Sequence, residues 1–351
     1  MFEVYIHSST MNQKHLYTEI ADEIRKRISH GNYVPGSRIP GHTRLAREFG
    51  VSPITSNRAL QELVKEGLVE RRERIGSFVS TQALRLRKIA IVVSARAGDT
   101  NKALSDYIRG VLGRTTELGV ESSIHYLLGS DMASAEWMQL QGTNANGFIC
   151  IGPTQYDTYI TAGKLGRPLV VVGTNVPPGE YFVTENRKDC TRDLVRAMRE
   201  DGYRRIGFIG NLYRPDHRTS RDGYLEGITD LGLGFRLIRD ANEETIGAVV
   251  KDLLAEDLGV EGVIVMGGNL SIAALPLIMI QRPQVKFGCL RENASVAPLA
   301  DVSYYGEYFQ EEVGRMAVDL LVDVYTGKVK GPCLRFSSYR IQRPRIATHG
   351  S

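Results

Sequence analysis

The 351-residue sequence predicts an α/β protein with two unlike parts, a small helical domain ending in a hairpin and a larger domain of doubly wound parallel sheets. The first 80 residues contain three helical stretches separated by glycine and proline turns. From Lys88 onward, short apolar strands alternate with helical stretches. The length exceeds what one small core needs, so we expect several folding units.

The composition is that of an ordinary soluble globular protein, with 42% hydrophobic and 24% charged residues. The sequence contains no run of about 18 uninterrupted apolar residues, so we expect no transmembrane helix. The N-terminus lacks an export signal, so we expect a cytoplasmic location without membrane partners. The cysteines are widely spaced, which predicts free buried thiols rather than disulfides or zinc ligands. These are Cys150, Cys190, Cys289 and Cys333.

The positive charge is concentrated at one end of the chain. Residues 1–87 hold 14 Lys and Arg against 9 Asp and Glu, whereas the remainder holds 30 against 31. This asymmetry predicts a polyanionic partner for the first quarter of the chain. A merely solvated basic surface is the alternative.

The first domain has the order helix, helix, helix and hairpin. The first helix is expected to end at Gly31, and its apolar stripe is Leu16, Ile20, Ile24 and Ile28. A second helix carries Leu45, Ala46 and Phe49 and ends at Gly50. The third has Ser52 as its N-cap and Pro53 at its first position. It runs to about Glu66, stops at Gly67 and is expected to bury Ile54, Leu60, Leu63 and Val64. Two short strands then enclose a basic tip, Arg71 to Gly76, which completes a winged helix-turn-helix plan.

The chemistry of this domain suits DNA. Short polar side chains at the start of the third helix can reach base edges in the major groove. Arg58 and the wing arginines can neutralise phosphates, and the backbone at Gly76 can approach them closely. Winged helices sometimes mediate only protein contacts. The localised charge and the polar third helix favour DNA binding.

This stretch, over about residues 13–80, resembles the GntR family of bacterial regulators. The matching residues are Pro35-Gly36-Ser37-Arg38-Ile39-Pro40, Leu45-Ala46, Phe49-Gly50-Val51-Ser52, Arg58-Ala59-Leu60, Leu63, Glu66-Gly67 and Gly76-Ser77-Phe78-Val79. The resemblance implies that a dimer recognises operator DNA. The sequence departs from the family's usual residues at Thr43, Pro53, Asn57 and Arg74, so the operator sequence does not follow from it. The candidate DNA-binding residues are Arg38, Thr43, Arg44, Ser52, Pro53, Thr55, Ser56, Asn57, Arg58, Arg74 and Gly76.

After a linker at residues 81–87, two sets of apolar strands predict two similar lobes. The first set is 89–94, 123–128, 147–152 and 168–173, and the second is 205–210, 235–240, 262–267 and 285–290. Lobe one is expected at about 88–182 and 294–325, and lobe two at about 183–293 and 326–351. This architecture places a small-molecule ligand between the lobes, at the carboxyl ends of the strands.

The second domain resembles the LacI-type sensor domain, which is periplasmic-binding-protein-like, over about residues 87–345. The best local matches are Leu194 to Gly210, Arg221-Asp222-Gly223-Tyr224 and Val313-Gly314 with Ala317 and Leu320-Leu321. The whole chain is similar to arabinose-repressor-type regulators. The resemblance implies a ligand-responsive repressor that works as a homodimer and senses a sugar or a sugar-derived molecule.

The candidate ligand-binding residues are Arg96, Tyr107, Tyr126, Asn175, Tyr213, Arg221, Asn269 and Arg291. The arginines, together with Arg214, favour an anionic effector such as a sugar acid or phosphate, or else they are solvated or ion-paired. The tyrosines either stack on a sugar ring or pack in the core, and the asparagines either bind hydroxyls or form turns.

No catalytic motif predicts an enzyme, because GxSxG, GxxxxGK[ST] and HExxH are all missing. We therefore expect a non-enzymatic protein without a cofactor or metal. The alternative is an α/β sensor or enzyme whose basic head docks a protein.

Overall fold

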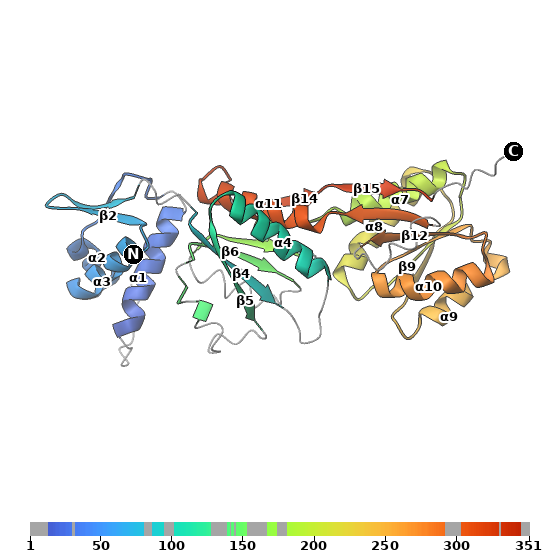
Figure 1. Ribbon diagram of the computed structural model, residues 1–351, viewed down its shortest axis with the longest axis horizontal. Coiled ribbons are helices and arrows are strands. Elements are labelled where there is room, and N and C mark those ends of the chain that lie inside the picture. The colour runs from blue at the N-terminus through green and yellow to red at the C-terminus, as the bar shows by residue number, and fades with distance from the viewer. Residues whose placement is uncertain are drawn as a thin grey trace, which may run out of the picture.

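The computed structural model describes residues 13–29, 32–80, 86–94, 102–127, 139–140, 142–143, 145–152, 167–173, 181–291, 303–329 and 331–344. The N-terminal domain, which we call the head, lies at one end of an elongated molecule, next to the first lobe (Figure 1). Its elements are α1 (Gln13–Ser29), β1 (Arg38–Ile39), α2 (His42–Phe49), α3 (Pro53–Lys65), β2 (Val69–Arg72) and β3 (Gly76–Val79).

The three predicted helices and the wing of the head are confirmed. Ile20, Ile24 and Ile28 of α1 are buried in one core with Leu60 and Leu63 of α3. The sheet has the order β1-β3-β2, and the sequence did not indicate its short edge strand β1.

One predicted core residue of the head is wrong. Ile54 is 82% exposed, because it occupies the second position of α3, before the helix meets the head's core. The inward-facing stripe of this helix begins at Ser56 and Ala59.

Each lobe of the second domain is built on a six-stranded sheet. The order in lobe one is β14-β8-β7-β6-β4-β5, and every neighbouring pair is parallel. Its strands are β4 (Lys88–Ser94), β5 (Glu121–Leu127), β6 (Gly147–Ile151), β7 (Leu169–Val172), β8 (Tyr181–Glu185) and β14 (Cys333–Ser337). Helices α4 (Lys102–Glu117) and α11 (Gln310–Tyr325) pack with them in one core.

Lobe two repeats this design with the order β10-β9-β11-β12-β13-β15, in which only β15 is antiparallel to its neighbour. Its strands are β9 (Ile206–Gly210), β10 (Leu237–Asp240), β11 (Gly262–Val265), β12 (Lys286–Arg291), β13 (Ser303–Tyr308) and β15 (Tyr339–Gln342). Its helices are α7 (Arg187–Glu200), α8 (Pro215–Asp230), α9 (Ile246–Leu253), α10 (Gly268–Gln281) and the short η1 (Glu256–Leu258). The predicted pair of doubly wound lobes is confirmed.

The predicted boundaries of the lobes need correction, because one of them cuts a strand and the others assign two strands to the wrong lobe. Residues 183–185 complete β8 in lobe one, β13 joins the sheet of lobe two, and β14 returns to lobe one. The linker prediction also changes at its end. Leu86 is buried in the core of lobe one, and Arg87 donates its backbone N–H to Asn146 Oδ1 at 3.1 Å. Residues 86–87 therefore belong to lobe one, and 81–85 lie outside the described residues.

All four cysteines are free, as predicted; Cys150, Cys190 and Cys289 are buried, whereas Cys333 is partly exposed. Among the described residues, no helix combines the length and the apolarity that crossing a membrane requires.

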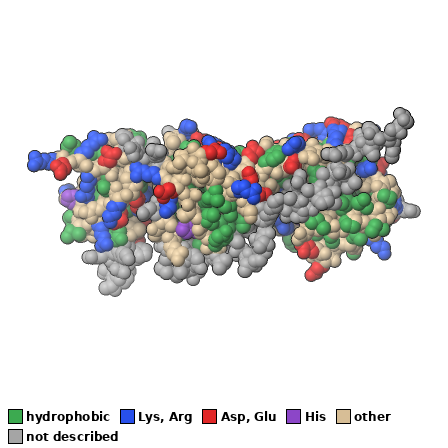
Figure 2. Space-filling view, viewed as in Figure 1, with side chains coloured by type: hydrophobic (Ala, Val, Ile, Leu, Met, Phe, Trp, Pro, Cys, Tyr) green, Lys and Arg blue, Asp and Glu red, His purple; other side chains and the backbone are tan. Residues whose placement is uncertain are grey.

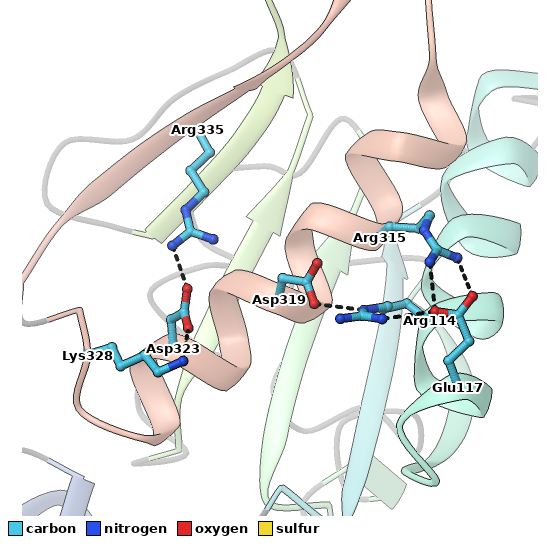
Figure 3. A network of polar contacts seen from close by, with 7 residues as sticks. All are labelled: Arg114, Glu117, Arg315, Asp319, Asp323, Lys328 and Arg335. Atoms are coloured by element: carbon cyan, nitrogen blue, oxygen red, sulfur yellow. Dashed lines mark hydrogen bonds and ion pairs between the residues drawn. The ribbon is translucent and has the colours of Figure 1, made fainter.

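Helices α4 and α11 cross very closely at two glycines. A Cβ on Gly110 would overlap the carbonyl oxygen of Glu311, and a Cβ on Gly314 would overlap that of Tyr107. Charged residues from both helices then form ion pairs along the contact, as Figure 3 shows. Arg315 binds both carboxylate oxygens of Glu117 at 2.7–2.8 Å, and the network extends to β14. Its other members are Arg114, Asp319, Asp323, Lys328 and Arg335.

We expect Gly110→Ala to destabilise lobe one by about 2 kcal/mol, because the new methyl group must push the two helix backbones apart. Gly113→Ala is the matched control in the same helix, since its Cβ would approach no atom closer than Arg315 Nη1 at 3.8 Å. It should stabilise the helix by roughly 0.5–1 kcal/mol. Urea unfolding followed by circular dichroism compares the two. Equal stability of both variants would contradict the close crossing.

Candidate functional site

The candidate DNA-binding residues lie on α2, α3 and the wing, and most of them are accessible. Seven are exposed and three are half-buried. The exposed residues are Arg38, Thr43, Arg44, Ser52, Pro53, Arg58 and Arg74, and the half-buried ones are Thr55, Asn57 and Gly76. The head therefore presents a polar and cationic surface around the N-terminus of α3. Such a surface combines hydrogen-bonding groups for base edges with cations for phosphates.

Two serines near the start of α3 have structural roles. Ser52 is the N-cap, and its hydroxyl accepts the N–H of Thr55 at 3.1 Å while staying exposed. Ser56 was predicted to contact DNA, and this is wrong, because its side chain is completely buried. Its hydroxyl donates to the carbonyl oxygens of His42, at 2.7 Å, and Pro53, at 3.1 Å. Ser56 thus ties α3 to the start of α2.

Contacts within the head orient the remaining polar groups. Arg71 of the wing donates to Asn57 Oδ1 at 2.6 Å, which links the wing to the exposed side of α3. The Arg58 guanidinium lies 4.4 Å from the centroid of the Tyr17 ring on α1. At the tip of the wing, Arg74 has a left-handed backbone, with φ of 60°. The wing and α3 therefore form one surface.

Ile54 is a candidate contact that the sequence reasoning missed. Its side chain is 82% exposed beside Pro53 and Thr55 at the start of α3. An apolar side chain in this position can contact a thymine methyl group in the major groove. The sequence signal for its exposure was its position directly after Pro53, in the first turn of α3. The residues that α3 buries in the head begin only later, at Ser56.

The topology places the carboxyl ends of both sheets of the second domain toward the crossings between the lobes. The carboxyl ends of β8 and β14, at Glu185 and Ser337, lead directly from lobe one into lobe two. The carboxyl end of β13, at Tyr308, leads back from lobe two into α11 of lobe one. Since neighbouring strands are parallel, the loops that follow them gather at the same two edges. Ligands of open parallel sheets bind at such edges.

Buried charged side chains, which we call the crossing cluster, occupy the first crossing. Glu185 ends β8 in lobe one and accepts a hydrogen bond from the hydroxyl of Tyr107. Arg187, which begins α7 in lobe two, lies 3.7 Å from Glu185 Oε2 and 3.9 Å from Asp216 Oδ2. Arg214 pairs with Asp216 at 2.8 Å. All but Arg214 are buried, so the cluster joins the lobes electrostatically.

The ion pairs determine the charge state of Asp216. Burial alone would raise the pKa of this carboxyl group, but the guanidinium groups of Arg187 and Arg214 outweigh that effect. The pKa of Asp216 is therefore held well below its ordinary value, and the carboxylate stays ionised at neutral pH. Its neighbour His217 is buried at the ends of β9 and β11, where Nδ1 accepts the N–H of Asn211 at 2.9 Å.

The predicted ligand-binding residues are divided between several environments. Tyr213 is 85% exposed in the loop after β9, and Asn269, after β11, donates to Glu243 Oε1 at 2.5 Å. Tyr126 is exposed on the edge strand β5, and Arg221 of α8 pairs with Asp222 at 2.6 Å. The structure thus brings Tyr213 and Asn269 to one edge of lobe two. Arg96, Asn175 and the side chain of Arg291 lie outside the described residues.

Tyr107 was predicted to stack on a ligand, and the structure corrects this. Its ring is buried in the core of lobe one, where α4 meets α11, and its hydroxyl is used by Glu185. The sequence placed it correctly on a helix but could not show which side of that helix faces the core.

Comparisons with known proteins agree with this arrangement. Residues 16–79 match the family model described as bacterial regulatory proteins, gntR family. The mannosyl-D-glycerate transport/metabolism system repressor MngR of Escherichia coli (strain K12) is 39% identical over 72 residues. This alignment covers 20% of the chain and 30% of the relative. The histidine utilization repressor of Klebsiella aerogenes is 36% identical over 85 residues, which are 23% of the chain and 35% of the relative. The chain thus spans about a third of the length of these curated relatives.

Solved structures resemble most of the chain. A transcriptional regulator CelR–cellobiose complex has a TM-score of 0.59 at 19% identity, covering 84% of this chain and 90% of that one. The Lac repressor bound to ONPG has a TM-score of 0.60 at 15% identity, covering 83% and 89%. At these identities the likeness concerns the fold. The chain therefore carries a GntR-type helix-turn-helix domain, joined to a two-lobed domain with the fold of LacI-type regulators.

Proposed function

We propose that this protein is a ligand-responsive DNA-binding repressor that senses a sugar or a sugar-derived molecule between its two lobes. The observation that carries the proposal is the exposed polar and cationic surface around α3, in a head that matches the GntR family model. The MngR and histidine utilization relatives are repressors by name, and they match this chain in the same region.

In this proposal α3 enters the major groove, and Arg44, Arg58 and the wing arginines contact phosphates. Arg38, Thr43, Ser52, Pro53, Thr55, Asn57, Arg74 and Gly76 remain candidate contacts on the same surface. Asn57 is already bound to Arg71, so we expect these two side chains to meet DNA as a pair. The alternative, a head that docks an acidic protein, would use the same cations without base recognition.

For the effector, the pairing of two candidate arginines with carboxylates favours an uncharged molecule. Arg214 and Arg221, which suggested an anionic ligand, are paired with Asp216 and Asp222. An anionic effector would have to compete with these carboxylates. Tyr213 and Asn269 offer a ring to stack on and an amide to bind hydroxyl groups, which suits a neutral sugar.

We further propose a homodimer that uses α10 of lobe two. Ile272, Met279 and Ile280 are exposed on one side of this helix, and Ala273 and Pro276 lie between them in sequence. Their spacing places them along one stripe, opposite Leu270, Ala274 and Ile278 in the core. Figure 2 shows hydrophobic side chains gathered on this end of the molecule. A second copy would cover this stripe and give a two-fold molecule two heads for two half-sites.

DNA binding is tested first by gel shift, with DNA from near the protein's own gene. Arg44→Ala should weaken operator binding roughly tenfold and lower the salt dependence by about one counterion, because one phosphate contact is lost. Lys65→Ala, which removes the same charge from the far end of α3, is the matched control and should bind normally. If no specific complex forms in any ligand state, the head does not bind DNA as proposed, and if both variants bind like the unaltered protein, Arg44 of α2 makes no phosphate contact.

The effector is tested by a thermal-shift screen of neutral sugars against sugar acids and sugar phosphates. We expect a neutral sugar to raise the melting temperature, and Tyr213→Ala to weaken its binding roughly fivefold through loss of about 1 kcal/mol of stacking. Leu118→Ala, at an exposed position just after α4 of the other lobe, provides a comparison with an equally simple truncation. Stabilisation by anionic compounds alone would contradict a neutral effector.

The dimer is tested by sedimentation of Ile280→Glu. A carboxylate in the middle of an apolar interface loses its hydration, so we expect the dissociation constant of the dimer to rise at least tenfold. Because Ile280 is 80% exposed in the single chain, the fold itself should tolerate the change. Leu334→Glu, at an exposed position on edge strand β14, is the control. Loss of the dimer in this control and not in Ile280→Glu would move the interface to lobe one.

A further inference from the structure

The head meets lobe one through an ionic cluster that the DNA-binding and ligand-binding proposals do not use. On the head side, Arg25 of α1 is buried and binds Glu66, at the end of α3, through two hydrogen bonds of 2.6 and 2.8 Å. Arg25 also pairs with Asp22, one turn earlier on α1. These three side chains carry a net charge of −1, with Arg25 buried and the two carboxylates partly exposed. A further cation close to them would stabilise the excess negative charge.

Lobe one supplies that cation. Arg167 lies two residues before β7, and its Nη1 donates to the carbonyl oxygens of Thr143 at 3.0 Å and Ala145 at 2.7 Å. These bonds hold the guanidinium at the amino end of the lobe-one sheet. Burial lowers the pKa of Arg167, Arg25 lowers it further, and Glu66 and Asp22 raise it. In turn, burial raises the pKa of Asp22, whereas Arg25 and Arg167 lower it. Because Ala145, which Arg167 binds, adjoins Asn146, which binds Arg87, the Arg167 guanidinium lies close to the place where Arg87 contacts Gly67 of the head.

Direct packing at the same junction supports this arrangement. The Arg87 guanidinium lies against Gly67, where a Cβ would overlap it. Gly67 ends α3 with a left-handed φ of 68°. The backbone of Arg87 is held by Asn146 Oδ1, and the amide of Asn146 donates to the hydroxyl of Tyr325 at 2.9 Å. The end of α3 thus rests on residues that are fixed to β4, β6 and α11 of lobe one.

We propose that Arg167 is a positioning residue that holds the head on lobe one by balancing the charge of Asp22, Arg25 and Glu66. The consequence for regulation rests on the proposed function. The junction lies at the amino ends of β6 and β7, and the effector edge lies at their carboxyl ends. A five-residue strand spans only about 17 Å. A rotation of lobe one on effector binding would therefore carry the head with it.

Trypsin cleavage of the full-length protein between head and lobe one tests the junction without DNA or effector. Arg85, in the linker, is the site, and the masses of the fragments identify the cut. Arg167→Glu and Asp22→Arg should each speed this cleavage roughly tenfold, because each places like charges across the junction and raises the detached population. The double variant restores opposite charges, so its cleavage should return to within about twofold of the unaltered protein.

Arg205→Glu in lobe two is the matched control. Arg167 lies over the Phe148 ring as well as donating to two carbonyl oxygens. Arg205 likewise donates to the carbonyl oxygens of Leu258 and Gly259 and lies over the Phe235 ring. The Arg205→Glu variant should be cleaved in the linker at the rate of the unaltered protein. The proposal is overturned if neither single variant speeds cleavage. It is also overturned if the cleavage rate of the double variant rises by the product of the two single-variant factors, as expected for independent sites. If Arg167→Glu alone disrupts lobe one, Asp22→Arg must still speed cleavage, or the proposal fails.

A second measurement separates this proposal from the proposed function. On operators with altered half-site spacing, the unaltered protein should prefer one spacing, and Arg167→Glu should bind several almost equally while keeping its affinity for a single half-site. Restored cleavage in the double variant without any operator binding would support the junction and refute the DNA-binding proposal. A spacing preference that Arg167→Glu leaves intact would overturn the positioning role.

Discussion

The arrangement of the second domain depends on the buried ionic contacts where the chain first crosses between the lobes. Arg187 lies between a carboxylate of lobe one, Glu185, and a carboxylate of lobe two, Asp216, at separations slightly longer than a hydrogen bond. Removing either carboxylate would destabilise the fold, because a buried charge without its counterion costs several kcal/mol of folding free energy. A change in the angle between the lobes would alter only the distance from Arg187 to Glu185, because Arg187 and Asp216 both belong to lobe two. Arg187 would thus keep Asp216 as a counterion in more than one arrangement of the lobes, which a ligand-driven population shift requires.

Such a shift also requires that each lobe move as a unit. In lobe one the backbones of α4 and α11 meet at Gly110 and Gly314. In lobe two, α7 and α8 meet in the same way, since a Cβ on Gly223 would overlap the carbonyl oxygen of Lys188. Helices in such close contact cannot slide without collision of their backbones. The described part of the chain thus has closely packed lobes joined by three short crossings, so a movement of one lobe against the other would have to take place at the crossings.

Sequence reasoning predicted the elements whose burial follows from a simple pattern. The central parallel strands are continuous apolar runs, such as β6 and β9, and the head helices have regular stripes such as Ile20, Ile24 and Ile28. The missed strands are those near the crossings. β8, β13, β14 and β15 alternate polar with apolar residues or contain tyrosines, so none of them is a continuous apolar run. Their order cannot be read from local patterns, so the predicted lobe boundaries were wrong there.

The errors among the candidate contacts have a common physical cause. Ser56, Ile54 and Tyr107 each lie on a helix whose exposed side depends on a partner distant in sequence. Ser56 is turned inward by the carbonyl oxygen of His42, and Tyr107 is turned inward by Glu185. Residue type alone suggested the opposite for all three. The role proposed for Arg167 could not be predicted from the sequence either. It depends on the charges of Asp22 and Glu66, which lie about 100 or more residues away in sequence.

The positions of these contacts suggest one path from effector to DNA. The effector edge and the crossing cluster lie at the carboxyl ends of the lobe-one strands, and the head junction lies at their amino ends. Glu185 ends β8, Arg167 precedes the neighbouring strand β7, and the two strands are paired directly. If Arg167 positions the head as proposed, a change at the crossing would reach the junction through the paired and largely buried strands β7 and β8. The charges on lobe one would then set the orientation of the head.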